Sequence, residues 1–250
     1  TYKYYQELGY SNHPKVMNKG DVYFLIRKRF DNLFTLRSKV FRRSPIKAVQ
    51  SFQKVFEAFR YNLLENQELE KLKNIELAKL ESNPDVKEVE QINQLADMVD
   101  VFPQYQSWKQ EENWIDYGDM IFKFWELIKQ NENVLYEIQT HYKHVIVDEF
   151  QDNNYALSKI VEKIAEPENS LTVVGDDDQC IYAFRQANIQ NIQQFKLKYN
   201  AKNNSTISLL QNYRSRQPIL NLANGVIEHN KERTGKGKLI SNKDDELKPK

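Results

Sequence analysis

Apolar residues in the first part of the chain recur at steps of three and four, which is the period of amphipathic helices. One series predicts a helix near residues 48–63, with one face formed by Ala48, Phe52, Val55, Phe56, Phe59 and Leu63. Comparable series predict further helices over residues 69–80, 86–99 and 117–129. The stretch Ser-Asn-Pro-Asp at 82–85 is typical of a helix end followed by a new N-cap. The chain is therefore predicted to be helical up to about residue 143.

Beyond that point the pattern changes to short apolar runs that each end on polar residues. The three runs are Val145–Val147, Leu171–Val174 and Ile207–Leu210. Helical segments follow them, around residues 154–166, 188–199 and 217–229. A strand, a polar loop and a helix in repetition predict a parallel α/β sheet. Ligands of such sheets bind beyond the carboxyl ends of the strands, where all three polar loops fall.

Composition excludes several classes of protein. The 250 residues hold 36 Lys and Arg against 35 Asp and Glu, so the net charge of +1 does not by itself point to a nucleic-acid or membrane partner. A single cysteine, Cys180, excludes an intramolecular disulfide and favours a reducing compartment. No apolar run approaches the ~18 residues of a membrane helix. We therefore expect a soluble, cytoplasmic protein.

The net charge is close to zero only for the chain as a whole, and differs between its segments. Residues 1–60 carry 13 basic against 4 acidic side chains, residues 61–150 carry 8 against 19, and residues 151–250 carry 15 against 12. A basic first quarter could contact phosphates, although solvated helix faces explain the same pattern. The four histidines and one cysteine are too scattered for a metal site, and His141 and His144 are expected to flank a helix-to-strand junction.

The first polar loop places Asp148 and Glu149 directly after a predicted strand. Many ATPases hold Mg²⁺ and orient water with two such carboxylates. Solvated acidic pairs after strands are also common, so the pattern alone leaves both interpretations open.

The second and third loops add polar and aromatic side chains. In Gly175–Arg185 the amide of Gln179 could bond a phosphate oxygen, and the rings beyond it could stack on unpaired bases or fill a core. The three aspartates at 176–178 could hold a divalent ion, although adjacent residues rarely point at one ion. In the third loop Arg214 could fork onto a phosphate or form a surface ion pair.

Together the three loops resemble the UvrD/Rep/PcrA-type superfamily 1 DNA helicases. The sequence DEFQD at 148–152 is similar to motif II of that family, GDDDQCIYAFR at 175–185 to motif III, and QNYRS at 211–215 to motif IV. DYGDMI at 116–121 is similar to the helix start that precedes motif II. The resemblance is close over about residues 114–240, and rests before residue 110 on helical character and position alone.

The resemblance implies a role for each residue of the first two loops. Asp148 would coordinate Mg²⁺, and Glu149 would act as the catalytic base. Gln179 would sense the γ-phosphate of ATP and couple it to DNA, and Gln151 would lie in the same network at the nucleotide.

It also implies roles for the remaining candidates. Arg214 would contact the γ-phosphate, and Tyr213 would stack on the adenine. Phe184 would stack on single-stranded DNA, with help from Tyr182 and Arg185. Cys180 and Gln186 depart from the Ser and Gly that are usual in the family, but neither change removes a charge or a ring.

The implied fold is a RecA-like parallel sheet, part of a P-loop NTPase motor domain, with a large helical insertion domain. Residues 1–112 would form the insertion called 1B. Residues 113–215 would form the second half of motor domain 1A and reach motif IV, and residues 216–250 would begin the next motor domain.

The implied function is ATP-dependent translocation on DNA in the 3′ to 5′ direction, with single-stranded DNA and single/double-strand junctions as partners. No Gly-x-x-x-x-Gly-Lys-Ser/Thr loop occurs in the sequence, so the triphosphate cradle is missing. We therefore expect a piece of a longer helicase that is inactive by itself. The alternatives are an ATPase-deficient nucleic-acid-binding or scaffold module, and part of a helicase–nuclease.

Overall fold

The computed structural model describes residues 3–33, 36–82, 84–166, 170–180, 190–199, 206–229 and 237–243. The chain forms two compact units, residues 1–145 with 154–171 and residues 146–153 with 172–250. Within the described residues, no helix has both the length and the apolar character needed to span a membrane.

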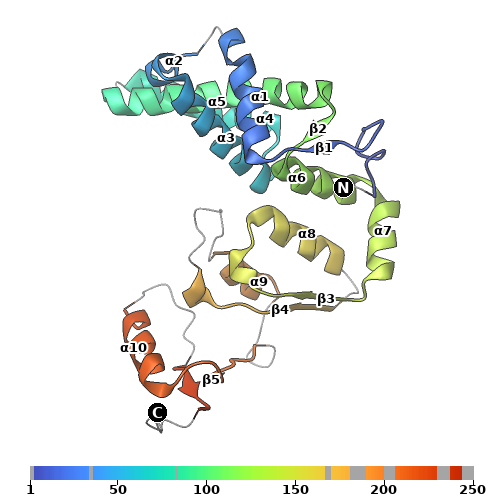
Figure 1. Cartoon of the computed structure of the whole chain (residues 1–250), viewed down its shortest axis with the longest axis vertical. Helices are drawn as coiled ribbons and strands as arrows, with labels where there is room; N and C mark the ends of the chain where they lie inside the picture. The colour runs from blue at the N-terminus through green and yellow to red at the C-terminus, as the bar shows by residue number, and fades with distance from the viewer. Residues whose placement is uncertain are drawn as a thin grey trace, which may run out of the picture. The chain divides into compact units, whose positions relative to one another are not determined.

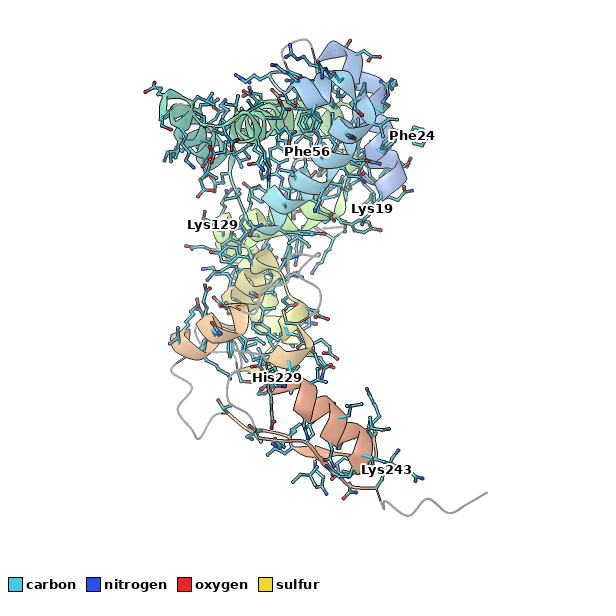
Figure 2. The ribbon with its side chains drawn as sticks, turned by 90° about the vertical axis from the view of Figure 1, so that its left-hand side faces the viewer. Lys19, Phe24, Phe56, Lys129, His229 and Lys243 are labelled. Atoms are coloured by element: carbon cyan, nitrogen blue, oxygen red, sulfur yellow. The ribbon has the colours of Figure 1, made fainter. Side chains whose placement is uncertain are left out.

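Most of the first unit is a bundle of helices, coloured blue to green in Figure 1. Its members are α1 (Lys19–Arg29), α2 (Lys39–Arg43), α3 (Pro45–Tyr61), α4 (Asn66–Ala78) and α5 (Val86–Glu111), with 3-10 turns η1 (Phe30–Asn32) and η2 (Lys79–Ser82). Of the apolar face predicted for residues 48–63, Ala48, Phe52, Phe56 and Phe59 are buried on α3, while Leu63 lies beyond the helix end. Phe56 stacks on Tyr105 of α5 with ring centroids 5.1 Å apart. Phe56 lies among the helices, whereas Phe24 of α1 is 72% exposed on the outer side (Figure 2).

A capping box fixes where α5 begins. Asp85 accepts hydrogen bonds from the backbone of Lys87 and Glu88, and Glu88 bonds back to the backbone of Asp85. These bonds satisfy donors at the helix start that have no partner within the helix. The N-cap predicted at 82–85 is therefore confirmed.

The rest of the first unit carries a second apolar core. This part of the unit comprises the parallel pair β1 (Lys15–Val16) and β2 (Trp114–Ile115) and the helices α6 (Tyr117–Gln130), α7 (Glu132–His141) and α8 (Tyr155–Ala165). The buried side chains of this core are Tyr4, Leu127, Ile128, Val134, Ile138 and Ile160. The helix predicted over 117–129 is confirmed as α6, and His141 and His144 do flank a helix-to-strand junction.

Four largely buried charges join α3, α5 and α6 inside the first unit. The Lys109 ammonium contacts the carboxylates of Asp116, at 2.5 Å, and Asp119. Arg60 Nε donates to Asp119 Oδ1 at 3.1 Å, and the Tyr105 hydroxyl donates to Asp116 Oδ2 at 2.7 Å. Two positive and two negative groups thus neutralise one another, which is the condition under which buried charges are tolerated.

Asp116 also caps α6, because its Oδ1 accepts the backbone N–H of Asp119 at 2.7 Å. Burial opposes ionisation of this carboxyl, but the Lys109 ammonium and the donated hydrogen bonds outweigh burial and hold the pKa of Asp116 below its usual range. Burial beside Asp116 also raises the pKa of Tyr105. The tyrosine is therefore the neutral donor of the network.

The described strands form three two-stranded sheets. Besides β1–β2 these are β3 (His144–Val147) with β4 (Ser170–Val173), and β5 (Gln211–Asn212) with β6 (Ile240–Ser241). Lys143 bonds to Ser170 and Val147 to Val174, so β3 and β4 run in the same direction. The first two predicted strands and their parallel order are confirmed.

The third predicted strand is wrong as placed. Residues 206–210 form no strand in the described structure, and Ile207 and Leu209 are about four-fifths exposed, at 82% and 79%. A strand forms only at residues 211–212, where β6 runs alongside and supplies backbone partners. The run therefore joins β6 and does not extend the β3–β4 sheet.

The second unit contains η3 (Phe150–Asp152), η4 (Asp177–Gln179), α9 (Gln190–Lys198) and α10 (Gln217–Ile227), besides β5 and β6. Phe150 is buried, with its ring 5.3 Å from that of Phe195 on α9. The buried amide of Asn224 on α10 exchanges hydrogen bonds with the backbone of Leu239. This amide ties α10 to the segment that leads into β6.

Candidate functional site

The first two polar loops leave neighbouring ends of the β3–β4 pair. Val174 N–H donates to the carbonyl of Val147 at 2.8 Å, and Phe150 N–H donates to the carbonyl of Val174 at 2.9 Å. Backbone pairing thus continues beyond both strands into the loops. Because the strands are parallel, their carboxyl ends meet at one edge, as the sequence predicted for these two loops.

Asp148 and Glu149 occupy a sharp turn at this edge. Glu149 adopts the left-handed conformation, with φ 50° and ψ 43°, and its N–H donates to Asp148 Oδ1 at 2.9 Å. A residue other than glycine adopts this conformation at a cost of about 1–2 kcal/mol, so the surroundings must hold it. Both residues are exposed, which leaves their carboxylates accessible to a ligand.

A buried glutamine ties the two loops together, and an exposed one bonds within the second loop. Gln151, which is 2% exposed, donates to Glu149 Oε2 at 2.6 Å and accepts the Asp176 N–H at 3.0 Å. Gln179 is exposed, and its amide donates to Asp176 Oδ2 at 2.7 Å. The structure therefore brings four candidates, Asp148, Glu149, Gln151 and Gln179, into two connected loops.

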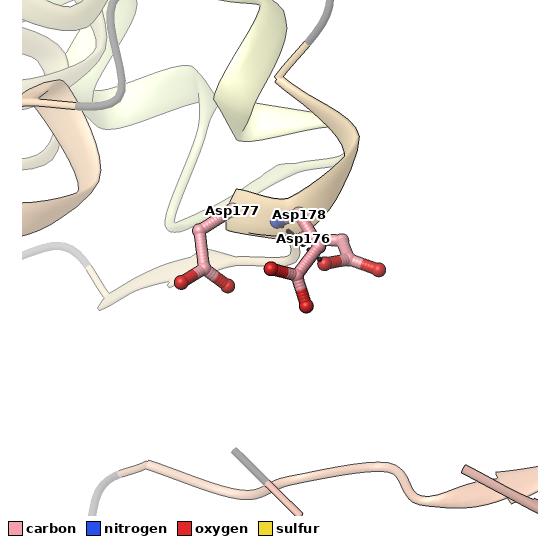
Figure 3. Close-up of side chains that lie close together, drawn as sticks. All are labelled: Asp176, Asp177 and Asp178. Atoms are coloured by element: carbon pink, nitrogen blue, oxygen red, sulfur yellow. Dashed lines mark hydrogen bonds between the residues drawn. The ribbon is translucent and has the colours of Figure 1, made fainter. Parts of the chain in front are cut away.

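Three adjacent carboxylates gather in the second loop, as Figure 3 shows. One oxygen from each of Asp176, Asp177 and Asp178 lies within 4.8 Å of the others. The Asp176 carboxylate accepts the backbone N–H of Asp178 and the amide of Gln179, and so caps the 3-10 turn η4. The position of the Asp176 carboxylate is thus explained by its hydrogen bonds within the turn.

The third loop, between β5 and α10, carries Tyr213 and Arg214. Asn212 Oδ1 accepts the N–H groups of Arg214 at 2.9 Å and Ser215 at 2.7 Å, which fixes the turn. Lys243 donates to the Arg214 carbonyl at 2.6 Å. Both Tyr213 and Arg214 are exposed, and within the described part of the chain no ion pair joins Arg214 to a carboxylate.

The described contacts bring only two of the three loops into bonding distance. Among the described residues, no hydrogen bond joins Tyr213 or Arg214 to the first two loops. The predicted DNA-contacting residues Tyr182, Phe184 and Arg185 lie outside the described residues, so their roles stay predictions.

Two positions of the second loop, Gly175 and Asp176, shape the site in ways that the sequence did not predict. Gly175 passes so close to Gln151 that a Cβ on it would lie 2.9 Å from Gln151 Oε1. Asp176 bonds to both glutamines, through its N–H to Gln151 and through its carboxylate to Gln179. The one available signal is a glycine directly after the apolar run Leu171–Val174, since a glycine beside a strand is typical of close backbone approach.

Comparison of the sequence with protein-family models identifies the family to which this chain belongs. The model described as "UvrD/REP helicase N-terminal domain" matches residues 2–200 of the chain. The chain therefore belongs to the UvrD/REP helicase family, as the motifs indicated.

Individual relatives match shorter stretches of the chain. DNA helicase II of Haemophilus influenzae is 37% identical over 138 residues, which cover 55% of this chain and 19% of the relative. ATP-dependent DNA helicase PcrA of Leuconostoc citreum is 40% identical over 139 residues, covering 56% of this chain and 18% of the relative. PcrA of Staphylococcus aureus is 41% identical over 142 residues, covering 57% of this chain and 19% of the relative. The matched stretch thus spans less than a fifth of each of these relatives.

Proposed function

We propose that this chain is part of an ATP-dependent DNA helicase or translocase. The observation that carries the proposal is the pairing of two polar loops at the carboxyl ends of β3 and β4, with Asp148 and Glu149 exposed. Membership of the UvrD/REP family supports it, as do relatives named as ATP-dependent DNA helicases. The phosphate-binding loop would come from other residues of the complete protein.

The donor set of the first loop fits a magnesium ion. Mg²⁺ binds through one or two carboxylates and takes its other oxygens from water and phosphates. Asp148 is exposed and offers a carboxylate oxygen for this purpose. When bound, the ion would neutralise charge on the β- and γ-phosphates.

Glu149 would accept the proton of the attacking water, since it directly follows Asp148 in an exposed turn. Gln179 would contact the γ-phosphate, and Arg214 would stabilise charge that develops on it. Tyr213, whose ring is 65% exposed, would stack on the adenine.

DNA contact is proposed for the segment that follows the second loop. Phe184 would stack on an unpaired base, with Tyr182 and Arg185 beside it. We further propose a RecA-like motor domain interrupted by a helical insertion at residues 1–112, movement in the 3′ to 5′ direction, and binding at single/double-strand junctions.

The test compares ATPase activity of the 250-residue chain and of the complete protein encoded by its reading frame. We expect activity stimulated by single-stranded DNA in the complete protein only, because the chain lacks a triphosphate cradle. Strand displacement on duplexes with a 3′ or a 5′ single-stranded tail then reports direction. DNA binding without ATPase activity in the complete protein would favour a scaffold.

A further inference from the structure

Gln151 occupies a buried position between the two loops. It is 2% exposed, and both ends of its amide are used inside the protein. The nitrogen donates to Glu149 Oε2 at 2.6 Å, and the oxygen accepts the N–H of Asp176 at 3.0 Å. The Cys180 thiol adds a longer contact, 3.7 Å, to the Gln151 carbonyl.

The chemistry of the two partners fixes which way this amide faces. An ionised carboxylate only accepts hydrogen bonds, and a backbone N–H only donates. A primary amide serves both at once, whereas a carboxylate at this position would lose the donor and an apolar side chain would lose both bonds. The residue type is therefore specified by Glu149 on one side and Asp176 on the other.

Gly175 supplies the space that this bridge needs. A Cβ at Gly175 would lie 2.9 Å from Gln151 Oε1 and 3.4 Å from the backbone nitrogen of Phe150. An alanine there would push the Gln151 amide away from Asp176. The bridge thus depends on a residue from each loop.

The bridge holds a residue that the backbone alone would not favour. Glu149 lies in the left-handed region, with φ 50°. Its carboxylate accepts a bond from the buried Gln151, while its N–H bonds to Asp148. The side chain is thereby held in one place although the residue is exposed.

We propose that Gln151 is a positioning residue that couples the second loop to Glu149. A displacement of Asp176 would move the Gln151 amide and, through it, the Glu149 carboxylate. Gln179 bonds to Asp176 on the same loop, so a contact made by Gln179 would be transmitted to Glu149 through Asp176 and then Gln151. The proposal rests on the proposed role of Glu149 as the base, and it replaces nucleotide contact with positioning as the role of Gln151.

Steady-state ATPase kinetics of the complete protein test this role, with single-stranded DNA present and at about pH 8. Gln151→Met removes both bonds, and Gln151→Glu keeps the acceptor for Asp176 but removes the donor to Glu149. We expect both variants to lower kcat about 10²-fold with KM for ATP nearly unchanged, because a misplaced group costs rate and not ground-state binding. Gly175→Ala should change kcat in the same direction.

Gly225→Ala on α10 is the matched control, because a Cβ there meets nothing within 4 Å and activity should remain that of the wild type. Unchanged kcat in both Gln151 variants, or a raised KM with normal kcat, would overturn the positioning role. A wild type without ATPase activity would overturn the proposed function and the positioning role together.

Hydrogen exchange in the complete protein tests the bridge independently of activity. Loss of one hydrogen bond should speed exchange of the Asp176 amide about tenfold in Gln151→Met. Gln151→Glu should leave that amide protected, because its remaining oxygen still accepts the bond. Equal protection in the wild type and in Gln151→Met would overturn the bridge even if the ATPase rates had fallen.

Discussion

Charged side chains occupy two contrasting regions of this protein. In the first unit, Lys109 and Asp119 are almost fully buried, and each charge is neutralised by a partner within the protein. At the ends of β3 and β4, Asp148 and Glu149 are exposed, and Arg214 on the third loop is exposed without a carboxylate partner among the described residues. The residue types are the same, but their surroundings differ.

This difference agrees with a structural role for the buried charges and with the functional role proposed for the exposed ones. Buried charges need internal partners, and the resulting network fixes how α3, α5 and α6 pack. Exposed carboxylates and guanidiniums keep their charge available to a phosphate or a cation. The left-handed backbone of Glu149 belongs to the second region, as is expected of a turn with the catalytic role proposed for Glu149.

The largest effect should come from the exposed arginine. In the complete protein, Arg214→Ala should lower ATP turnover roughly 10³-fold or more, on the scale of arginine fingers. Arg214→Lys should restore little, because a point charge does not reproduce the planar fork. Thermal stability should stay near that of the wild type, since the Arg214 side chain is exposed. Turnover near normal in both variants would show that Arg214 has no part in ATP turnover.

Replacing the buried Lys109 should mainly lower the stability of the fold. Lys109→Met leaves Asp116 and Asp119 without their ammonium partner, and should lower the free energy of unfolding by about 3–5 kcal/mol. Urea titration of the 250-residue chain measures this change. Lys71→Met, at an exposed position of α4, is the matched control and should change little. Equal stabilities of the two variants would refute the structural role of the network.

Replacing Phe184 should lower DNA affinity by a smaller amount. If Phe184 stacks on an unpaired base, Phe184→Ala should cost about 1–3 kcal/mol of single-strand affinity and little stability. Phe184→Trp should hold or strengthen binding. Titration with single-stranded DNA at one fixed salt concentration, together with thermal melting, measures both. Early melting with normal DNA binding would place Phe184 in a core.

The smallest effect should be the pH dependence contributed by Asp116. Its pKa is lower in the folded state than the value of about 3.9 expected when unfolded. Ionised Asp116 therefore stabilises the fold above that pH, and the contribution is lost as pH falls from there through the folded-state pKa. Urea titrations between about pH 2 and 7 should show a shallower acid decline in Asp116→Asn than in the wild type. Parallel declines would contradict the lowered pKa.

Local pattern predicted the parts of this fold that local forces determine. The apolar face of α3 and the cap at Asp85 follow from spacing and residue type alone. The strand predicted at 207–210 failed because pairing depends on a distant partner, β6, which residue type does not reveal. The site residues of the first two loops were predicted from motifs. The resemblance placed Gln151 in the same network as Gln179, but it did not predict the bond to Asp176, which joins residues 25 positions apart in the sequence.

The central claim is that the exposed carboxylates carry catalysis, and Glu149→Gln tests it most directly. ATP binding and DNA-stimulated turnover would be measured side by side in the complete protein. The isosteric amide cannot accept the proton of water, so we predict wild-type ATP affinity with turnover reduced about 10²–10⁴-fold. Turnover within a few fold of the wild type would contradict the account.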